Sequence, residues 1–206
     1  MIKMAQLIDL TQLKEMALAA RAELRSEAAA MGRDVKIYLH WTAGGYNQVY
    51  NDYHICITGD GCIYTTTEDF SETLNHTWKR NTGSIGIALC GAYGAGSQSL
   101  GDYPPTAAQI EALAQTVAVL CLAIGIPADR QHVLTHGEAA NNEDGLHPHE
   151  PYAWWNDSYG DGDTRGDLEY LGTAESPSYN PWATDGSRGG DVLRGKINYY
   201  INQFNQ

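Results

Sequence analysis

Two histidines follow segments that the sequence predicts to be strands, and imidazole is a common ligand of catalytic zinc. His40 ends the alternating segment 35–40 and precedes a turn-like Ala-Gly-Gly, and His136 follows the short segment 132–135. Each histidine alone would more often be a structural residue. Because ligand sites in open α/β sheets gather beyond the carboxyl ends of strands, we nevertheless expect the two side chains to lie close together. A catalytic zinc needs a third protein ligand, often a carboxylate, and a position for water.

Helices and strands alternate along the chain around these histidines. Asp9 with Gln12, and Thr106 with Gln109, have the spacing of capping boxes, and each pair precedes apolar residues at helical intervals. The first of these helices forms an N-terminal extension, residues 1–33. The other expected elements are strands at 53–58, 62–66 and 84–90 and a C-terminal helix at 191–206. This order predicts an α/β fold in which helices flank a central mixed β-sheet, in one domain of residues 1–206.

A long aromatic-rich segment, residues 141–190, separates the last predicted strand from the C-terminal helix. It has no clear periodicity, which predicts a structured loop insertion that lines a site. Its aromatic residues, among them Trp154 and Trp155, could form a wall for sugars or peptide stems, or could equally anchor the loop on the core. His147 and His149 could hold a second metal, but such residues in an exposed loop are usually solvated.

Acidic residues outnumber basic ones: 25 Asp and Glu against 13 Lys and Arg give a net charge of −12. This charge repels phosphate backbones and anionic lipids, so we expect no nucleic-acid partner. No run approaches the ~18 apolar residues of a membrane span, so no membrane partner is expected either. Charges interrupt the apolar residues of MIKMAQLIDLTQLKEM, where a Sec signal peptide would need an unbroken apolar stretch of about 7–15 residues. We also expect a monomer.

Four cysteines, at positions 56, 62, 90 and 121, are too sparse and too irregular for a disulfide scaffold. No CxxC pair predicts a redox or zinc-ribbon site. Cys56 and Cys62 flank a hairpin expected around residues 59–61, and they could be cross-strand neighbours joined by a disulfide. The favoured alternative is that most of the cysteines are buried thiols.

Five short segments occur in a fixed order along the chain. They are LHWTAG at 39–44, NDYHICITGDGCIY at 51–64, NHTWKRNTGSIGIALCG at 75–91, VLTHGEAA at 133–140 and DTRGDLEYL at 163–171. In that order they resemble the zinc-dependent N-acetylmuramoyl-L-alanine amidases, and more narrowly the branch shared by phage endolysins and peptidoglycan recognition proteins. The resemblance covers roughly residues 35–171. Five ordered motifs are far less frequent by chance than one.

The resemblance implies that one Zn²⁺ is held by His40, His136 and Asp167. The family places a lysine two positions before its third ligand, and here Arg165 takes that position, where a cation could stabilise an oxyanion on the scissile carbonyl. The 31 positions from His136 to Asp167 make a longer separation than in compact members. Asp161 and Asp163 are therefore alternative third ligands, although the motif fits Asp167 best.

The sequence indicates the residue that assists the nucleophilic water less clearly than it indicates the metal ligands. Cytoplasmic relatives carry a glutamate in the strand position that Ala88 occupies here. The resemblance instead implies that Tyr53, from the family's Tyr-His motif, assists the water or polarises the carbonyl. Glu138, two residues past His136, is the competing base, and its alternative role is to cap the following helical turn.

Other side chains near the expected site are candidates for contacts with substrate. His76, in the NHT segment, matches a histidine that lies near the cleft in relatives, and it could equally be structural. Trp41 and Thr42 directly follow the first predicted strand and are expected to contact the substrate. His54 is expected to point to the opposite face of its strand from the preceding residue and to be buried.

The activity implied by the resemblance is hydrolysis of the amide bond between N-acetylmuramic acid and L-alanine, with peptidoglycan as substrate and partner. The favoured biological role is that of a phage or prophage endolysin, which accumulates in the host cytoplasm before it reaches the cell wall. The alternatives are a secreted antibacterial effector exported by a non-Sec route and a non-catalytic module that binds peptidoglycan in the same groove. Three candidate ligands favour the enzyme over the binding module.

Overall fold

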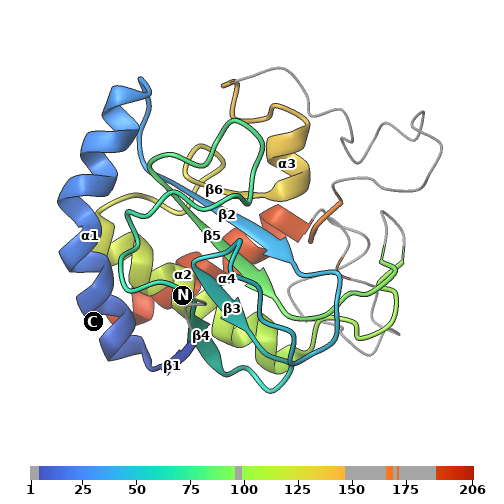
Figure 1. Cartoon of the computed structure of the whole chain (residues 1–206). Helices are drawn as coiled ribbons and strands as arrows, with labels where there is room; N and C mark the ends of the chain where they lie inside the picture. The colour runs from blue at the N-terminus through green and yellow to red at the C-terminus, as the bar shows by residue number, and fades with distance from the viewer. Residues whose placement is uncertain (1–4, 96–98, 147–165, 169–170, 172–188) are drawn as a thin grey trace.

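A mixed β-sheet forms the middle layer of the computed structural model, which describes residues 5–95, 99–146, 166–168, 171 and 189–206 (Figure 1). Within these residues the sheet has six strands, in the order β1 (Gln6–Ile8), β4 (Ile63–Thr65), β3 (Ile55–Ile57), β5 (Ser84–Leu89), β2 (Lys36–Trp41) and β6 (Val133–Thr135). β3, β5, β2 and β6 pair in parallel, whereas β4 pairs antiparallel with both β3 and β1. The predicted α/β fold with a central mixed sheet is confirmed.

One face of the sheet is covered by α1 (Leu10–Ala30), α2 (Ala107–Ile124) and α4 (Gly189–Phe204), with α2 in contact with both of the others (Figure 1). At the start of α1, Asp9 accepts the backbone N–H of Gln12 at 2.8 Å, and the Gln12 side chain accepts the N–H of Asp9 at 3.0 Å. Thr106 and Gln109 form the same capping box at the start of α2, which ends at Gly125 in a left-handed conformation. These helix ends agree with the sequence prediction.

The α2 helix is long and apolar enough, by length and composition alone, to cross a membrane. In the structure, 61% of it is buried. Leu113, Val117 and Leu120 are fully enclosed by the core between the sheet and the other helices. Its apolar composition is therefore explained by its central place in the core.

Side chains of β2 alternate between the two faces of the sheet, as the sequence predicts. Ile37, Leu39 and Trp41 join the core formed with the helices. Tyr38 belongs instead to a small cluster with Leu134 and Ala139 on the opposite face. All six residues of β2 are buried, so the second face is covered as well, in part by α3 (His136–Ala140), which packs on β2 and β6.

Two short elements differ from the sequence-based expectation. β1 pairs with β4 just before α1, in a segment for which the sequence predicts no strand. His136 is the first residue of the helix α3 rather than part of a loop, because Thr135 accepts the N–H of Glu138 and starts a helix directly at the end of β6. The C-terminal helix begins at Gly189 and ends at Phe204, close to the predicted range 191–206.

The disulfide considered between Cys56 and Cys62 does not form, because all four cysteines are free thiols. The register of the hairpin explains this result: Cys56 lies opposite Tyr64, and Cys62 lies in the turn before β4. Cys62 contacts Asp60 of the same turn. Cys56 is buried and packs in a small cluster with Ala88 and Cys90. The favoured alternative, buried thiols, is confirmed for Cys56, Cys90 and Cys121.

Candidate metal centre

His40, His136 and Asp167 converge at the carboxyl ends of β2 and β6. The Nδ1 atoms of the two histidines lie 3.0 Å apart. Oδ2 of Asp167 lies 3.5 Å from each of these Nδ1 atoms. The three residues are between 0% and 8% exposed. Among the residues that the structure describes, this is the group of histidine, cysteine and acidic side chains that could hold a metal ion.

Strand register brings the two histidines together although 96 positions separate them. Leu39 of β2 pairs with Thr135 of β6, so the next residue along each strand reaches the same level at the edge of the sheet. The hydrophobic residues that alternate with them fix this register, because a shift by one position would turn His40 into the helical core. The convergence therefore follows from the packing of the sheet.

Asp167 is held at the site by its neighbour in the chain. Leu168 is fully buried in the helical core and has a left-handed backbone, with φ of 62°. Its carbonyl lies so close to Gly189 that a Cβ atom there would be 1.5 Å away from the carbonyl oxygen. The first residue of α4 must therefore be glycine where the backbone of Leu168 passes it, and this contact places α4 against the residue that follows Asp167.

The distances between the three ligand atoms fit one zinc ion. Ligands at about 2.0–2.1 Å from a tetrahedral Zn²⁺ lie about 3.3–3.4 Å apart. The observed separations of 3.0, 3.5 and 3.5 Å bracket that value. Two imidazoles and one carboxylate are also a donor set typical of catalytic zinc, which leaves a fourth position for water. The residues present therefore fit the metal that the sequence predicts.

The charge on Asp167 is set by its surroundings. Burial raises the pKa of this carboxyl and is the largest single influence. The charge of His136 and hydrogen bonds from both histidines act in the opposite direction, and together they hold the pKa well below its ordinary value. The carboxylate is therefore ionised at neutral pH, as a metal ligand must be.

A second layer of polar groups supports His40. Its Nε2 atom lies 3.3 Å from the hydroxyl of Thr77, which lies 2.9 Å from Nδ1 of His76. The His76 ring packs directly on β5, where a Cβ atom on Gly86 would come within 2.5 Å of it. Burial is the main cause of a strongly lowered pKa for His76. His76 thus lies behind the metal ligand, in a buried position.

Comparison with known proteins assigns the chain to a family. The family model of N-acetylmuramoyl-L-alanine amidase matches residues 20–150, which include His40, Tyr53 and His136 but not Asp167. The chain belongs to the N-acetylmuramoyl-L-alanine amidase family. Among solved structures, the chain is similar to the Ph2119 endolysin from Thermus scotoductus MAT2119 bacteriophage Ph2119, with 22% identity and a TM-score of 0.40 over 52% of this chain and 73% of that chain. It is also similar to Drosophila PGRP-LB wild-type, with 19% identity and a TM-score of 0.39 over 63% of this chain and 82% of that one. No curated protein matches it.

Tyr53 lies beside His40, one of the candidate metal ligands. Its ring centroid is 5.0 Å from that of His40, at an interplanar angle of 46°. The residue is half-buried, and it packs against the cluster of Cys56, Ala88 and Cys90 beneath it. His54, next in the chain, is fully buried: its Nδ1 accepts the N–H of Gly86 at 3.0 Å. This burial agrees with the expectation for His54.

Glu138 is placed by the structure as a supporting residue rather than as a base. It is 1% exposed, and its two carboxylate oxygens each accept a hydrogen bond of 2.7 Å from the guanidinium of Arg194 on α4. One of these oxygens also accepts the N–H of Thr135, which completes the capping box of α3. The predicted alternative, a helix cap, describes these contacts. Three of the roughly four hydrogen bonds that this carboxylate can accept thus come from groups that support the fold.

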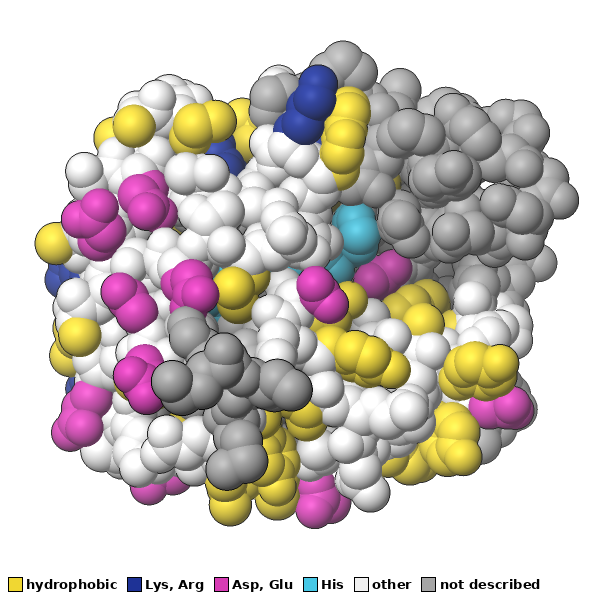
Figure 2. All heavy atoms as spheres, in the orientation of Figure 1, with side chains coloured by type: hydrophobic (Ala, Val, Ile, Leu, Met, Phe, Trp, Pro, Cys, Tyr) yellow, Lys and Arg dark blue, Asp and Glu magenta, His cyan; other side chains and the backbone are white. Residues whose placement is uncertain are grey.

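Trp41 contributes to the core rather than to a substrate surface. It is 6% exposed and belongs to the cluster of hydrophobic residues under the helices, because alternation along β2 directs it away from the face of His40. Thr42 is half-buried, and its hydroxyl accepts the N–H of Gly91 at 3.1 Å. In the view of Figure 2, histidine atoms are visible at the bottom of a recess in the surface, beside hydrophobic and acidic side chains.

Several predicted residues lie in segments 147–165, 169–170 and 172–188, outside the described residues. They are Arg165, Trp154, Trp155, the alternative ligands Asp161 and Asp163, and the histidines 147 and 149.

A buried ion pair that the sequence does not predict lies next to Tyr38 of β2. Arg80 is fully buried and donates two hydrogen bonds to the carboxylate of Asp144, at 2.8 and 3.0 Å. The Tyr38 hydroxyl donates to the same carboxylate at 3.0 Å. These contacts join the loop before β5 to the loop after α3 and to β2. Partners 64 positions apart leave no local pattern by which the sequence could reveal them.

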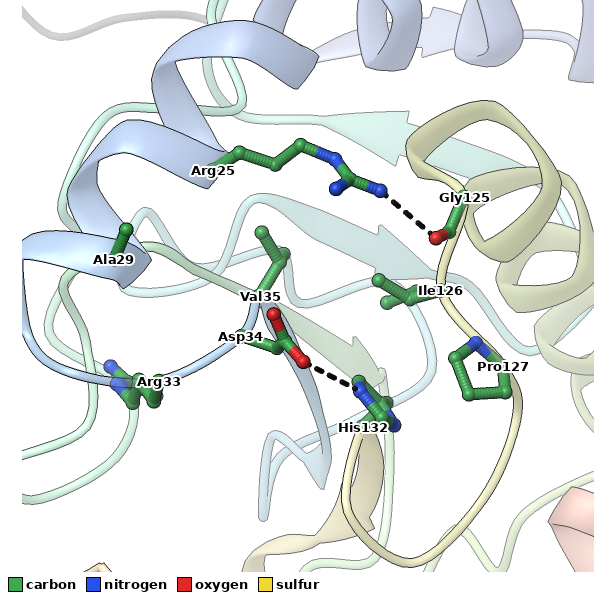
Figure 3. A pocket seen from close by; sticks show the side chains of 9 residues that line it. All are labelled: Arg25, Ala29, Arg33, Asp34, Val35, Gly125, Ile126, Pro127 and His132. Atoms are coloured by element: carbon green, nitrogen blue, oxygen red, sulfur yellow. Dashed lines mark hydrogen bonds and ion pairs between the residues drawn. The ribbon is translucent and has the colours of Figure 1, made fainter.

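A separate hollow of about 390 Å³ lies at the opposite, amino-terminal end of β2 (Figure 3). Arg25 reaches across it and donates to the carbonyls of Ile124 and Gly125, which end α2. Asp34 and His132 approach to 3.5 Å on its other side. Because the arginine binds carbonyl groups at a helix end, it serves the packing of α1 on α2.

Proposed function

We propose that this protein is a zinc-dependent amidase that hydrolyses the bond between N-acetylmuramic acid and L-alanine in peptidoglycan. The observation that carries the proposal is the convergence of His40, His136 and Asp167 at separations of 3.0–3.5 Å in a member of this family. A chain that only recognised peptidoglycan would not need three metal ligands. The non-catalytic binding module is therefore the less favoured candidate.

Each residue around the site would have a separate role in the reaction. His40 and His136 would hold the metal through Nδ1, with Asp167 as the third, anionic ligand. When bound, Zn²⁺ supplies Lewis acidity to the scissile carbonyl and lowers the pKa of water towards about 7. The hydroxyl of Tyr53 can donate a hydrogen bond to the oxyanion that develops on the carbonyl. Arg165, two positions before Asp167 in the chain, would bring a cation to the same oxyanion.

Purified cell-wall sacculi provide the direct test. The protein is expected to release peptides that begin with L-alanine, identified by mass spectrometry, and the release should stop with a chelator and return with zinc. Asp167→Ala should abolish both tight zinc binding and cleavage, because it removes the anionic ligand. Asp34→Asn, at the opposite end of β2, is the matched control and should keep both properties. Full cleavage by Asp167→Ala would refute the ligand assignment, and zinc-independent binding without cleavage would favour a recognition module.

The biological role is part of the same proposal. We place the protein as a phage or prophage endolysin that acts as a monomer on the cell wall and is stored in the host cytoplasm. A net charge of −12 makes binding through general attraction to anionic walls unfavourable, so affinity should come from the substrate groove itself. Expression in a bacterial cytoplasm is expected to leave cells intact until their membrane is permeabilised. Light scattering of the purified protein would measure its mass in solution.

A further inference from the structure

A tight turn in the loop before β5 begins beside the candidate metal centre. Its first residue is Thr77, whose hydroxyl lies 3.3 Å from Nε2 of His40. The N–H of Arg80 donates to the carbonyl of Thr77 at 3.1 Å, which closes the turn. The two residues at the tip, Trp78 and Lys79, are both exposed. The tip therefore faces solvent within two residues of a group that contacts a candidate ligand.

Both ends of this turn are fixed by the fold. Oδ1 of Asn81 accepts the N–H of Thr77 at 2.8 Å. Arg80 is fully buried, and its guanidinium pairs with the carboxylate of Asp144 at 2.8 Å. The same guanidinium donates to the carbonyl of Trp78 at 3.2 Å. The backbone at the tip is therefore in place before a substrate arrives, which lowers the cost of ordering it on binding.

Lys79 has a backbone conformation that a lysine rarely adopts. Its φ is 56°, in the left-handed region. At the third position of a turn with positive φ, glycine or asparagine is typical, because a β-carbon is strained there. Strained residues of this kind occur preferentially at functional sites. A lysine where glycine would fit the backbone better therefore points to a use for the side chain itself.

The ammonium group of Lys79 is a cation without a carboxylate partner among the described residues. Arg80, Arg194 and Lys196 each pair with an acidic side chain. Nζ of Lys79 instead lies 4.5 Å from the centre of the Trp78 ring, a contact that limits where the ammonium can move. In the view of Figure 2, basic and hydrophobic side chains meet above the recess that contains histidine atoms. In a chain with a net charge of −12, such a cation is suited to bind an anionic group of a ligand.

We propose that Lys79 is a specificity residue of this protein, whose ammonium group binds a carboxylate of the stem peptide in peptidoglycan. The inference rests on the proposed function and adds which part of the substrate the turn contacts. The stem peptide starts at the bond to be cleaved and carries carboxylates, at its glutamate and at its C-terminus, whereas the N-acetylated glycan is uncharged. A cation beside the metal centre therefore selects the peptide side of the substrate.

Kinetics on one muropeptide in two charge states test the proposal. The substrate is the N-acetylmuramoyl tetrapeptide isolated from sacculi, with its carboxylates either free or converted to carboxamides. The parent protein is expected to have the lower KM for the free form. Lys79→Met removes the charge, so the KM for the free form should rise roughly fivefold, the upper end for an exposed ion pair, with kcat within about twofold of the parent value. Its KM for the carboxamide form should be parental.

Two further variants and a change of salt separate charge recognition from other effects. Lys79→Arg keeps a cation at the tip and should keep the preference for the free form. Lys14→Met is the matched control, because it makes the same substitution at an exposed lysine of α1, on the helical face of the sheet, and it should behave like the parent protein. In about 1 M NaCl, where the Debye length is about 3 Å, the preference of the parent protein should largely disappear.

The outcomes are distinct for the two proposals. Equal KM values of the parent protein for the two forms would overturn the role of Lys79, as would a Lys79→Met variant that retains the preference. Failure of the parent protein to cleave either form would instead overturn the proposed function. Calorimetric binding of the two forms to the parent protein and to Lys79→Met would then still show whether this lysine selects the carboxylate.

Discussion

Asp167 links the metal centre to the body of the protein, although it lies beyond residues 20–150 that match the family model. Its carboxylate approaches both histidines to 3.5 Å, and the next residue, Leu168, is fully buried in the core. A core residue beside a ligand limits the freedom of the ligand without contacting the metal. Such an arrangement gives the pre-organisation that a catalytic site needs, since the cost of ordering the carboxylate is met on folding.

Tyr53 is the residue whose role can be separated most cleanly from metal binding. Tyr53→Phe removes a hydroxyl but keeps the ring that packs 5.0 Å from the ring of His40. We expect the turnover rate on soluble muropeptides to fall by about 100-fold, the usual effect of losing one donor to an oxyanion, while zinc affinity stays the same. Tyr199→Phe, an exposed phenol on α4, is the control and should have parental activity. A parental turnover rate in Tyr53→Phe would remove this residue from the mechanism.

At the scale of elements, α4 supports the short helix that carries His136. Arg194 of α4 donates to both oxygens of Glu138 and to the carbonyl of Val133 in β6. Gly190 leaves the space for this carboxylate, since a Cβ atom there would come within 2.4 Å of it. β6, α3 and α4 are therefore joined by one buried ion pair, and His136 is held at the junction of the first two.

Glu138→Gln distinguishes this supporting role from that of a general base. The substitution leaves Asp191, at 2.8 Å, as the only acidic partner of Arg194 among the described residues, so we expect the free energy of unfolding to fall by about 1–3 kcal/mol. At a temperature where the variant is still folded, its turnover rate should remain within about threefold of the parent value. Chemical denaturation and kinetics on the same samples give both numbers. If the turnover rate instead fell by about 100-fold, the size of a general-base contribution, with little change in stability, Glu138 would be restored as the base.

The same elements show which features the sequence could predict. The capping boxes at Asp9 and Thr106 each consist of two residues within a four-residue stretch of sequence. The sequence therefore predicts the starts of α1 and α2 correctly. β1 has three residues and α3 has five, too few for a periodic pattern. The prediction that Trp41 contacts substrate is wrong. It rests on the position of Trp41 next to the candidate ligand His40, whereas the alternation of side chains along β2 directs the indole into the core.

The support of the site depends on contacts between distant parts of the chain. The hydroxyl of Thr77 and Nε2 of His40 are 37 positions apart, and Arg80 and Asp144 are 64 positions apart. No spacing rule relates such pairs, because they meet only after the sheet has set the register of its strands. The candidate ligands could thus be named from motifs, whereas the groups that orient them required the folded structure.

At the scale of the whole molecule, burial of histidines makes stability depend on pH. Burial lowers the pKa of His54 to about 4, against opposing effects of Glu72 and Asp69 that raise it. The Nε2 atom of this histidine contacts the carbonyl of Glu72 at 2.7 Å, and its Nδ1 accepts from Gly86, so the folded protein holds it neutral. In the unfolded chain the same group binds a proton near pH 6.5.

The sign of the effect follows from the number of protons bound in each state. Between pH 6.5 and about 4 the unfolded chain binds a proton at His54 that the folded protein does not, so stability falls as the pH falls through this range. The difference in pKa corresponds to about 3 kcal/mol, present in full above pH 6.5 and lost by about pH 4. Urea denaturation of the protein in EDTA, which excludes an effect of metal release, should show this loss. In His54→Gln the fall over the same range should be smaller by about 3 kcal/mol, because glutamine does not titrate, and parallel pH profiles for the two proteins would show that His54 is not held neutral by the fold.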